Sequence, residues 1–236
     1  MARNHNDFST EKSTIMLVIR LLLAAVLAGI LLAAAIFMLP YFSPHSFLSE
    51  ILPRQASGYR NHIPSSASHI PEISLSFDVQ GHNQCAGYVT AFIRRYYGDE
   101  VYGSEVYREI SYNSPVDIGV PPHRIMRNFE ENSLNASART GDLEHIKHYA
   151  AREIPVIVLV GQGISWQHYM VLIGFDSEKS ELYFYDSEVS SFDRSRSDPG
   201  NRTMSEEKFL KIWQNRLPVF SQLFITVEPP PASDVT

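Results

Sequence analysis

The segment HNQCAGYVTAFIRRYYG, residues 82–98, holds the one cysteine of a chain of 236 residues. Apolar residues recur there at helical spacing and Gly98 supplies a stop, which predicts a helix with Asn83 as its N-cap and Cys85 in its first turn. The N-terminus of a helix stabilises negative charge, so a cysteine there has the setting of a thiolate nucleophile. Most lone cysteines are instead small buried apolar residues. The nucleophile hypothesis therefore needs a base and an orienting group elsewhere in the chain.

Two polar residues bound a predicted hairpin in the second half of the chain. His168 opens the strand HYMVLIGF, and Asp186 closes the next strand, LYFYD. In an antiparallel hairpin the start of one strand lies beside the end of its partner, so Asp186 is expected to reach the far ring nitrogen of His168. His168 would then be the base for the thiol, and Asp186 would fix its tautomer. Taken singly, His168 could be an interior histidine satisfied by the backbone, and Asp186 could start a turn.

A nucleophile of this kind also needs hydrogen-bond donors for the developing oxyanion. Gln80 lies five residues before Cys85, at the end of the strand predicted over 72–79. Its side-chain amide and the backbone N–H of Cys85 are the predicted donors. Gln84, next to Cys85, is the alternative.

At these residues the chain resembles a known family. The pattern Q-x4-C-A, followed by a helix and YYG, then PVIVLV, W-x-H-Y-M-V-L-I-G-F-D and LYFYDS, is similar to the papain-like bacteriocin-processing peptidases and their peptidase-like relatives. The similarity covers roughly residues 73–227. Where the family usually has Cys-Gly-Pro-Ala, this chain has CAGY, and the glutamine stands five residues before the cysteine instead of the typical six.

The resemblance implies a papain-like fold with Cys85 as nucleophile, His168 as base, Asp186 as orienting group and Gln80 as oxyanion donor. The implied activity is that of a cysteine peptidase acting on a peptide or protein through a thioester, with no cofactor. Two alternatives stay open. One is a catalytically silent papain-like domain that binds a peptide or a cell-wall component, and the other is a transglutaminase-like acyltransferase or amidase.

The remaining pattern predicts an α+β domain in which the helix of Cys85 packs on an antiparallel sheet. Further helices are expected at about 103–111, 121–132 and 142–152, and one more after a capping box formed by Thr203 and Glu206. Strands are expected at 72–79, 156–160, 169–175 and 182–186, with a closing strand LFITVE. The polar segment 187–203 is expected to be a loop that either overhangs the site as a flap or connects two elements at the surface.

The N-terminal part of the chain predicts a membrane segment. The 19 residues from Leu21 to Leu39 carry no charge, and a helix of this length nearly spans a hydrocarbon core. The basic residues Arg3, Lys12 and Arg20 precede them. The run ends on the bulky FMLPYF, which favours an uncleaved anchor over a signal peptide. Either way the rest of the chain is expected outside the cytoplasm.

The expected organisation is therefore a cytoplasmic tail over 1–20, an anchor over 21–42, a linker over 43–70, the peptidase domain over 71–229 and a tail over 230–236. The formal net charge of −6 gives no reason to expect nucleic acid as a partner. A single cysteine excludes an intrachain disulfide and a zinc site built on cysteine clusters. His145 and His148 have helical spacing but lack a third ligand, so a solvated helix face is expected there and no metal.

Overall fold

The computed structural model describes residues 5–38, 53–57, 63–68, 78–111, 119–188, 200–217 and 219–229. The chain divides into two compact units, Met1–Phe47 and Leu48–Thr236. The larger unit begins well before the domain start expected at residue 71.

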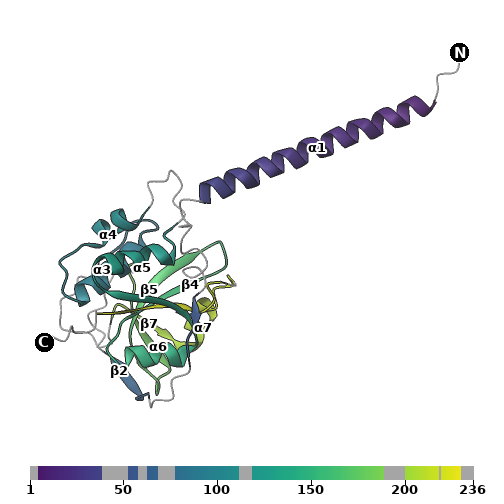
Figure 1. Ribbon diagram of the computed structural model, residues 1–236. Coiled ribbons are helices and arrows are strands. Elements are labelled where there is room, and N and C mark those ends of the chain that lie inside the picture. Colours follow the sequence, from purple (N-terminus) through teal and green to yellow (C-terminus); the bar gives the residue numbers. More distant parts are fainter. Residues whose placement is uncertain are drawn as a thin grey trace. The chain divides into compact units, whose positions relative to one another are not determined.

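The first unit contains helix α1, His5–Met38 (Figure 1). The apolar run expected from Leu21 is thus helical, but the helix starts 16 residues earlier, in the segment expected to be a cytoplasmic tail. No proline or glycine interrupts the sequence from His5 to Leu27. Because adding a residue to an existing helix is far easier than nucleating one, the polar N-terminal residues continue the helix of the apolar run.

The second unit is built on one sheet with the path β1-β3-β8-β4-β5-β6-β7, while β2 pairs with β5 away from that path. The central strands β4, β5 and β6 form the predicted antiparallel meander. The strands are β1 (Arg54–Gln55), β2 (Ser66–Ser68), β3 (Asn135–Thr140), β4 (Val156–Gly161), β5 (Gln167–Asp176), β6 (Glu181–Tyr185), β7 (Arg202–Ser205) and β8 (Leu223–Glu228).

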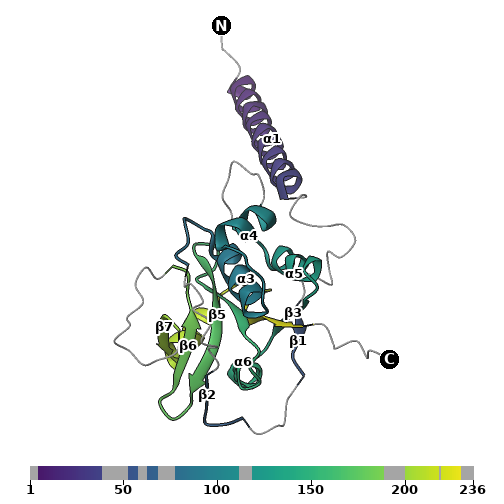
Figure 2. The ribbon, with the colours of Figure 1, turned by 90° about the vertical axis from the view of Figure 1, so that its left-hand side faces the viewer.

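Helices cover both faces of this sheet, as the two ribbon views show (Figures 1 and 2). On one face lie α3 (Cys85–Tyr96), α4 (Gly103–Ile110) and α5 (Pro122–Glu131), and on the other lie α6 (Leu143–Ala150) and α7 (Glu206–Trp213). The predicted α+β order, with the Cys85 helix packed on the sheet, is confirmed.

The sequence of β4 explains how two cores form. Ile157 and Leu159 belong to the core beneath α3, and Val156, Val158 and Val160 belong to the core beneath α6 and α7. Successive strand residues point to opposite faces, so a strand covered by helices on both sides must be apolar throughout. This accounts for the uninterrupted run VIVLV.

Four short strands have no counterpart in the predicted set. Two of them, β1 and β2, come from the segment expected to be a linker, and pair with β3 and β5. The other two, β3 (NASART) and β7 (RTMS), have mostly small or polar residues, so neither shows the apolar alternation by which a strand is recognised. Of the strand predicted over 72–79, residues 72–77 lie outside the described residues, and Asp78 and Val79 are not in a strand.

Two helix starts differ from the predicted caps. Gln84 is the N-cap of α3, while Asn83 has φ 55° in the turn before it. For α7 the N-cap is Ser205, whose hydroxyl accepts from the backbone N–H of Lys208, and the predicted pair of Thr203 and Glu206 does not form the cap. In both cases a neighbouring polar residue takes the position, which leaves Cys85 in the first turn of α3 as predicted.

A glycine contact fixes α3 against α4. A Cβ built on Gly87 would lie 2.6 Å from the backbone nitrogen and Cα of Tyr107, and one built on Gly103 would lie 2.5 Å from the ring of Tyr88. Such distances exclude any larger residue unless backbone moves. The two helices therefore approach closely at the turn that carries Cys85.

Candidate active site

Cys85 is the first residue of α3 and is 9% exposed. The first turn of this helix contains no acidic residue. The backbone N–H groups at a helix start carry partial positive charge, and no carboxylate of the helix itself offsets it. The position thus places the Cys85 sulfur at the positive end of the helix dipole.

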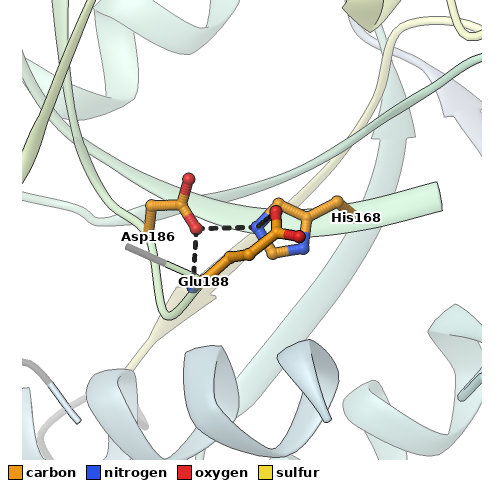
Figure 3. A group of neighbouring side chains, drawn as sticks. All are labelled: His168, Asp186 and Glu188. Carbon is orange, nitrogen blue, oxygen red and sulfur yellow. Dashed lines mark hydrogen bonds and ion pairs between the residues drawn. The ribbon is translucent and has the colours of Figure 1, made fainter. Parts of the chain in front are cut away.

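His168 on β5 and Asp186, the residue directly after β6, lie together (Figure 3). Nε2 of His168 donates to Oδ1 of Asp186 at 2.8 Å, and the two side chains are 4% and 0% exposed. The pairing follows from the sheet, because Val171 pairs with Tyr185 and the two chains run on from there to His168 and Asp186. The proximity expected from the hairpin is therefore present.

The ring of His168 also interacts with Cys85. Burial lowers the pKa of His168, but the hydrogen bonds with Asp186 and with the Cys85 side chain and the charges of both groups outweigh it and raise that pKa to about 10. Because Nε2 is engaged by Asp186, the histidine lies between the thiol and the carboxylate. This order is the one a thiol, a base and an orienting acid require.

Asp186 has two further partners besides His168. Its Oδ1 also accepts from the backbone N–H of Glu188 at 2.9 Å, and its Oδ2 forms an ion pair with Nε of Arg202 at 2.5 Å. Burial raises the pKa of Asp186, but the hydrogen bond and charge of His168, the charge of Arg202 and the Glu188 N–H together lower it below the ordinary aspartate value. The carboxylate is therefore held ionised.

Gln80 and Gln84 differ in what their side chains do. The hydroxyl of Ser187 donates to Oε1 of Gln80 at 2.6 Å, and the backbone N–H of Gln80 donates to the Ser187 carbonyl at 2.9 Å. Oε1 of Gln84 accepts from the N–H of Gly81 at 3.1 Å, within the turn that caps α3. The structure thus ties Gln80 to the residue next to Asp186 and ties Gln84 to its own turn.

Trp166 lies at the exposed edge of this cluster. Its ring stacks on that of His168 with centroids 6.0 Å apart, and the residue is 39% exposed. It precedes β5 in the loop from β4, which Asn215 holds through hydrogen bonds of 2.6 and 2.7 Å with the side-chain amide of Gln167. The indole therefore presents an apolar surface beside the His168 ring. Most of the segment 187–203, expected as a flap or a connector, lies outside the described residues.

The described residues contain one group of ligand-type side chains close enough to hold a metal ion. It consists of His168, Asp186 and Glu188, whose ligand atoms lie within 4.8 Å of one another. A cation there would compete with His168 Nε2–H for the same carboxylate. His145 and His148 are not on the solvated face expected for them, since His148 is 6% exposed and Nδ1 of His145 contacts the capping Asp142 at 2.6 Å.

The residues that sequence reasoning missed all surround Asp186. Ser187 and Glu188 follow it directly, so the polar sequence after the strand was a usable signal. Asn201 precedes β7 and Arg202 opens it, and this strand is too short and polar to be recognised. Without that strand, no feature of the sequence places them beside Asp186.

The sequence matches one protein-family model, described as the Peptidase_C39 like family, over residues 69–218. The match covers more than half of the chain and includes all four predicted site residues. No curated protein matches the sequence.

Several solved structures are similar to this chain. A protein from Bacillus anthracis described as a C39-like peptidase is 16% identical and matches 69% of this chain and 98% of its own, with a TM-score of 0.52. The peptidase domain of ComA, a bifunctional ABC transporter of Streptococcus, is 20% identical over 64% of this chain and 96% of its own, with a TM-score of 0.49. Xylellain, a cysteine protease from Xylella fastidiosa, is 11% identical over 75% and 91%, with a TM-score of 0.45.

The raised pKa of His168 gives a test of this cluster that does not depend on activity. In the full chain in detergent, the carbon-bound imidazole resonances of His168 should titrate near pH 10, well above the ordinary value of about 6.5. Asp186→Asn removes the carboxylate and should move the midpoint down towards the ordinary value.

The same shift predicts how stability depends on pH. Protonated His168 contributes stability that is complete below about pH 6.5 and is lost as the pH rises towards 10, because the folded-state pKa lies above the unfolded one. An NMR titration midpoint near pH 6.5 for the His168 ring of the wild type would show that the thiol and the carboxylate do not raise its pKa as described.

Proposed function

The chain belongs to the Peptidase_C39-like family of papain-like cysteine peptidases, and on that premise we propose that Cys85, His168 and Asp186 are its catalytic triad. The observation that carries the proposal is the contact of one buried histidine with both the thiol at the start of α3 and the buried carboxylate after β6. Each residue has a role suited to its place. Cys85 is the nucleophile, His168 the acid and base, and Asp186 the group that orients His168.

Acylation begins with transfer of the Cys85 thiol proton to His168. The thiolate attacks the carbonyl carbon of the scissile peptide bond, forming a C–S bond and an oxyanion. As the oxyanion collapses, the C–N bond breaks and His168 gives its proton to the leaving amine. The product is a thioester on Cys85, and the C-terminal part of the substrate departs.

Deacylation repeats these steps with water. His168, now neutral, takes a proton from a water molecule that attacks the thioester carbonyl. The C–S bond then breaks, the carboxylic product leaves, and the thiolate and imidazolium are restored. Asp186 stays ionised throughout and holds the ring in one orientation.

Gln80 is the proposed oxyanion donor, together with the backbone N–H of Cys85. Its support is the hydrogen bond from Ser187, because a hydroxyl that donates to Oε1 leaves the amide nitrogen, Nε2, as the free donor end. Gln84 is less suited, because its Oε1 is used in the turn that caps α3. In this proposal the hydrogen bond from buried Ser187 orients the Gln80 amide.

The proposed substrate is a peptide or protein segment. The support is membership of a peptidase family, together with an exposed aromatic side chain, Trp166, beside the histidine. The triad would serve an acyltransferase or amidase equally well, and a silent domain would keep the fold without turnover. Both are outcomes of the experiment below.

The triad is tested by single substitutions measured against a peptide library, with mass spectrometry identifying the cleaved peptides and kcat/KM following for the best one. Cys85→Ser and His168→Ala should each lower kcat/KM by at least about 10⁴-fold, because each removes the same proton transfer. Asp186→Asn should cost about 100-fold less. The double variant of Cys85 and His168 should be no worse than either single one.

The matched control is Glu188→Gln, which removes an exposed carboxylate 3.9 Å from the His168 ring and keeps the Glu188 backbone N–H that donates to Asp186. It should retain most of the activity. Near wild-type turnover in Cys85→Ser, or a harmless Asp186→Asn beside a damaging Glu188→Gln, would refute the assignment. Transfer of the acyl group to an added amine in preference to water would identify an acyltransferase, and no turnover of any library member would favour the silent domain.

We also propose that α1 anchors the enzyme in a membrane with its peptidase domain outside the cytoplasm. The support is the window Ile15–Ala33, which is long and apolar enough to span a bilayer and has none of its residues buried. Basic residues precede the apolar run, which favours retention of that end in the cytoplasm. A signal sequence would pass the same test of length and composition.

Topology is tested by adding protease to intact cells that express the full chain with a C-terminal tag. The tag should be digested without lysis, and the domain should sediment with membranes, whereas a cytoplasmic control protein stays intact. The mass of the purified protein decides between anchor and signal, because an anchor leaves residues 1–42 in place. A tag that stays protected until the cells are lysed would overturn the proposed orientation.

A further inference from the structure

The two oxygens of the Asp186 carboxylate face two different basic side chains. Its Oδ1 faces the His168 ring at 2.8 Å, and its Oδ2 faces the guanidinium of Arg202 at 2.5 Å. The Asp186 side chain is fully buried, while that of Arg202 is 35% exposed. A buried carboxylate interacts strongly with each nearby charge, so the presence of one cation changes how strongly the carboxylate stabilises the other.

Arg202 is held in this place by the backbone. It opens β7 and pairs with Phe184 of β6, two residues before Asp186. Asn201 joins the strands more tightly, since its Oδ1 accepts from the N–H of Asp186 and its Nδ2 donates to the Asp186 carbonyl, both at 2.8 Å. Gly200, with φ 75°, lies so close to the Phe184 carbonyl that a Cβ would overlap it.

The contacts that hold Asp186 in position are separate from its ion pair with Arg202. The two hydrogen bonds of Asn201 hold the Asp186 backbone, and the N–H of Glu188 holds Oδ1. These contacts do not involve the guanidinium of Arg202, so the carboxylate stays aimed at His168 without it. Arg202 adds a positive charge next to Oδ2, the oxygen that does not bind His168.

We propose that Arg202 is a positioning residue that limits how tightly Asp186 holds the protonated His168 ring, so that the ring can release its proton to the leaving amine. The proposal rests on the triad proposed above. An imidazolium bound to an unshared buried carboxylate is a weak acid, and a general acid works best when it gives up its proton near the operating pH. Arg202 takes part of the carboxylate charge and makes His168 a stronger acid.

The other charged or titratable groups around this pair stay the same when Arg202 is changed. Cys85 faces the His168 ring from α3, and the carboxylate of Glu188 lies 3.9 Å from Nε2. Tyr185, at the end of β6, is close enough to Asp186 for the carboxylate charge to raise its pKa, though burial is the larger cause. A shift in the titration of His168 on substitution of Arg202 therefore reports the lost guanidinium.

The test compares Arg202→Gln with Arg202→Lys in the full chain in detergent, with the titration midpoint of the His168 ring read by NMR. Loss of the cation in Arg202→Gln should raise the midpoint by about one pH unit, the usual effect of one nearby charge. Arg202→Lys keeps a cation and should stay close to the wild type. Asn201→Ala, which loosens the backbone without changing charge, should not raise the midpoint.

An unchanged or lowered midpoint in Arg202→Gln, in a variant whose amide spectrum remains that of the folded protein, would overturn the proposal. If Arg202→Gln disturbs that spectrum, Arg202→Met is a second neutral variant with the same expected rise. The readout needs no substrate and no turnover. It therefore separates failure of this inference from failure of the triad, which the Cys85→Ser and His168→Ala kinetics decide.

Discussion

The buried carboxylate of Asp186 is the feature around which the site is organised. An ionised carboxylate with no exposure to water is costly unless it is paired and hydrogen-bonded. Here an imidazole, a guanidinium and a backbone N–H all converge on its two oxygens. These partners come from β5, from β7 and from the turn after β6, so a single buried charge joins three adjacent parts of the sheet.

The thiol of Cys85 reaches this cluster from α3, a helix whose place is fixed by packing. Gly87 lets α4 approach α3 within the turn that carries Cys85, and the apolar face of α3 is buried on the sheet. Gln80 closes the site by pairing with Ser187, the residue after Asp186. Cys85 on α3 and His168 on β5 are thus held by regular elements, and Gln80 by its hydrogen bonds with Ser187, which is what accurate positioning of a reacting group requires.

Much of this arrangement can be read from the sequence, because its signals are local. The apolar runs of β4, β5 and β6, the helical spacing after Cys85 and the polar residues at strand ends predict the α+β fold and bring together His168 and Asp186. The partners of Asp186 at the start of β7 could not be predicted. Asn201 and Arg202 follow a long polar segment, and RTMS pairs with β6 through backbone hydrogen bonds that leave no apolar pattern. The glutamine choice likewise depends on Ser187, a contact across 107 positions.

The central claim is that Cys85 and His168 act as one thiolate–imidazolium pair. It is tested most directly by the rate at which iodoacetamide alkylates Cys85 as a function of pH, in the wild type and in His168→Ala, followed by mass spectrometry of the full chain. The account predicts fast, pH-dependent alkylation in the wild type, and its loss in His168→Ala, because that substitution removes the base that takes the thiol proton. A slow reaction in both proteins, rising only in alkali, would show a buried structural thiol and contradict the account.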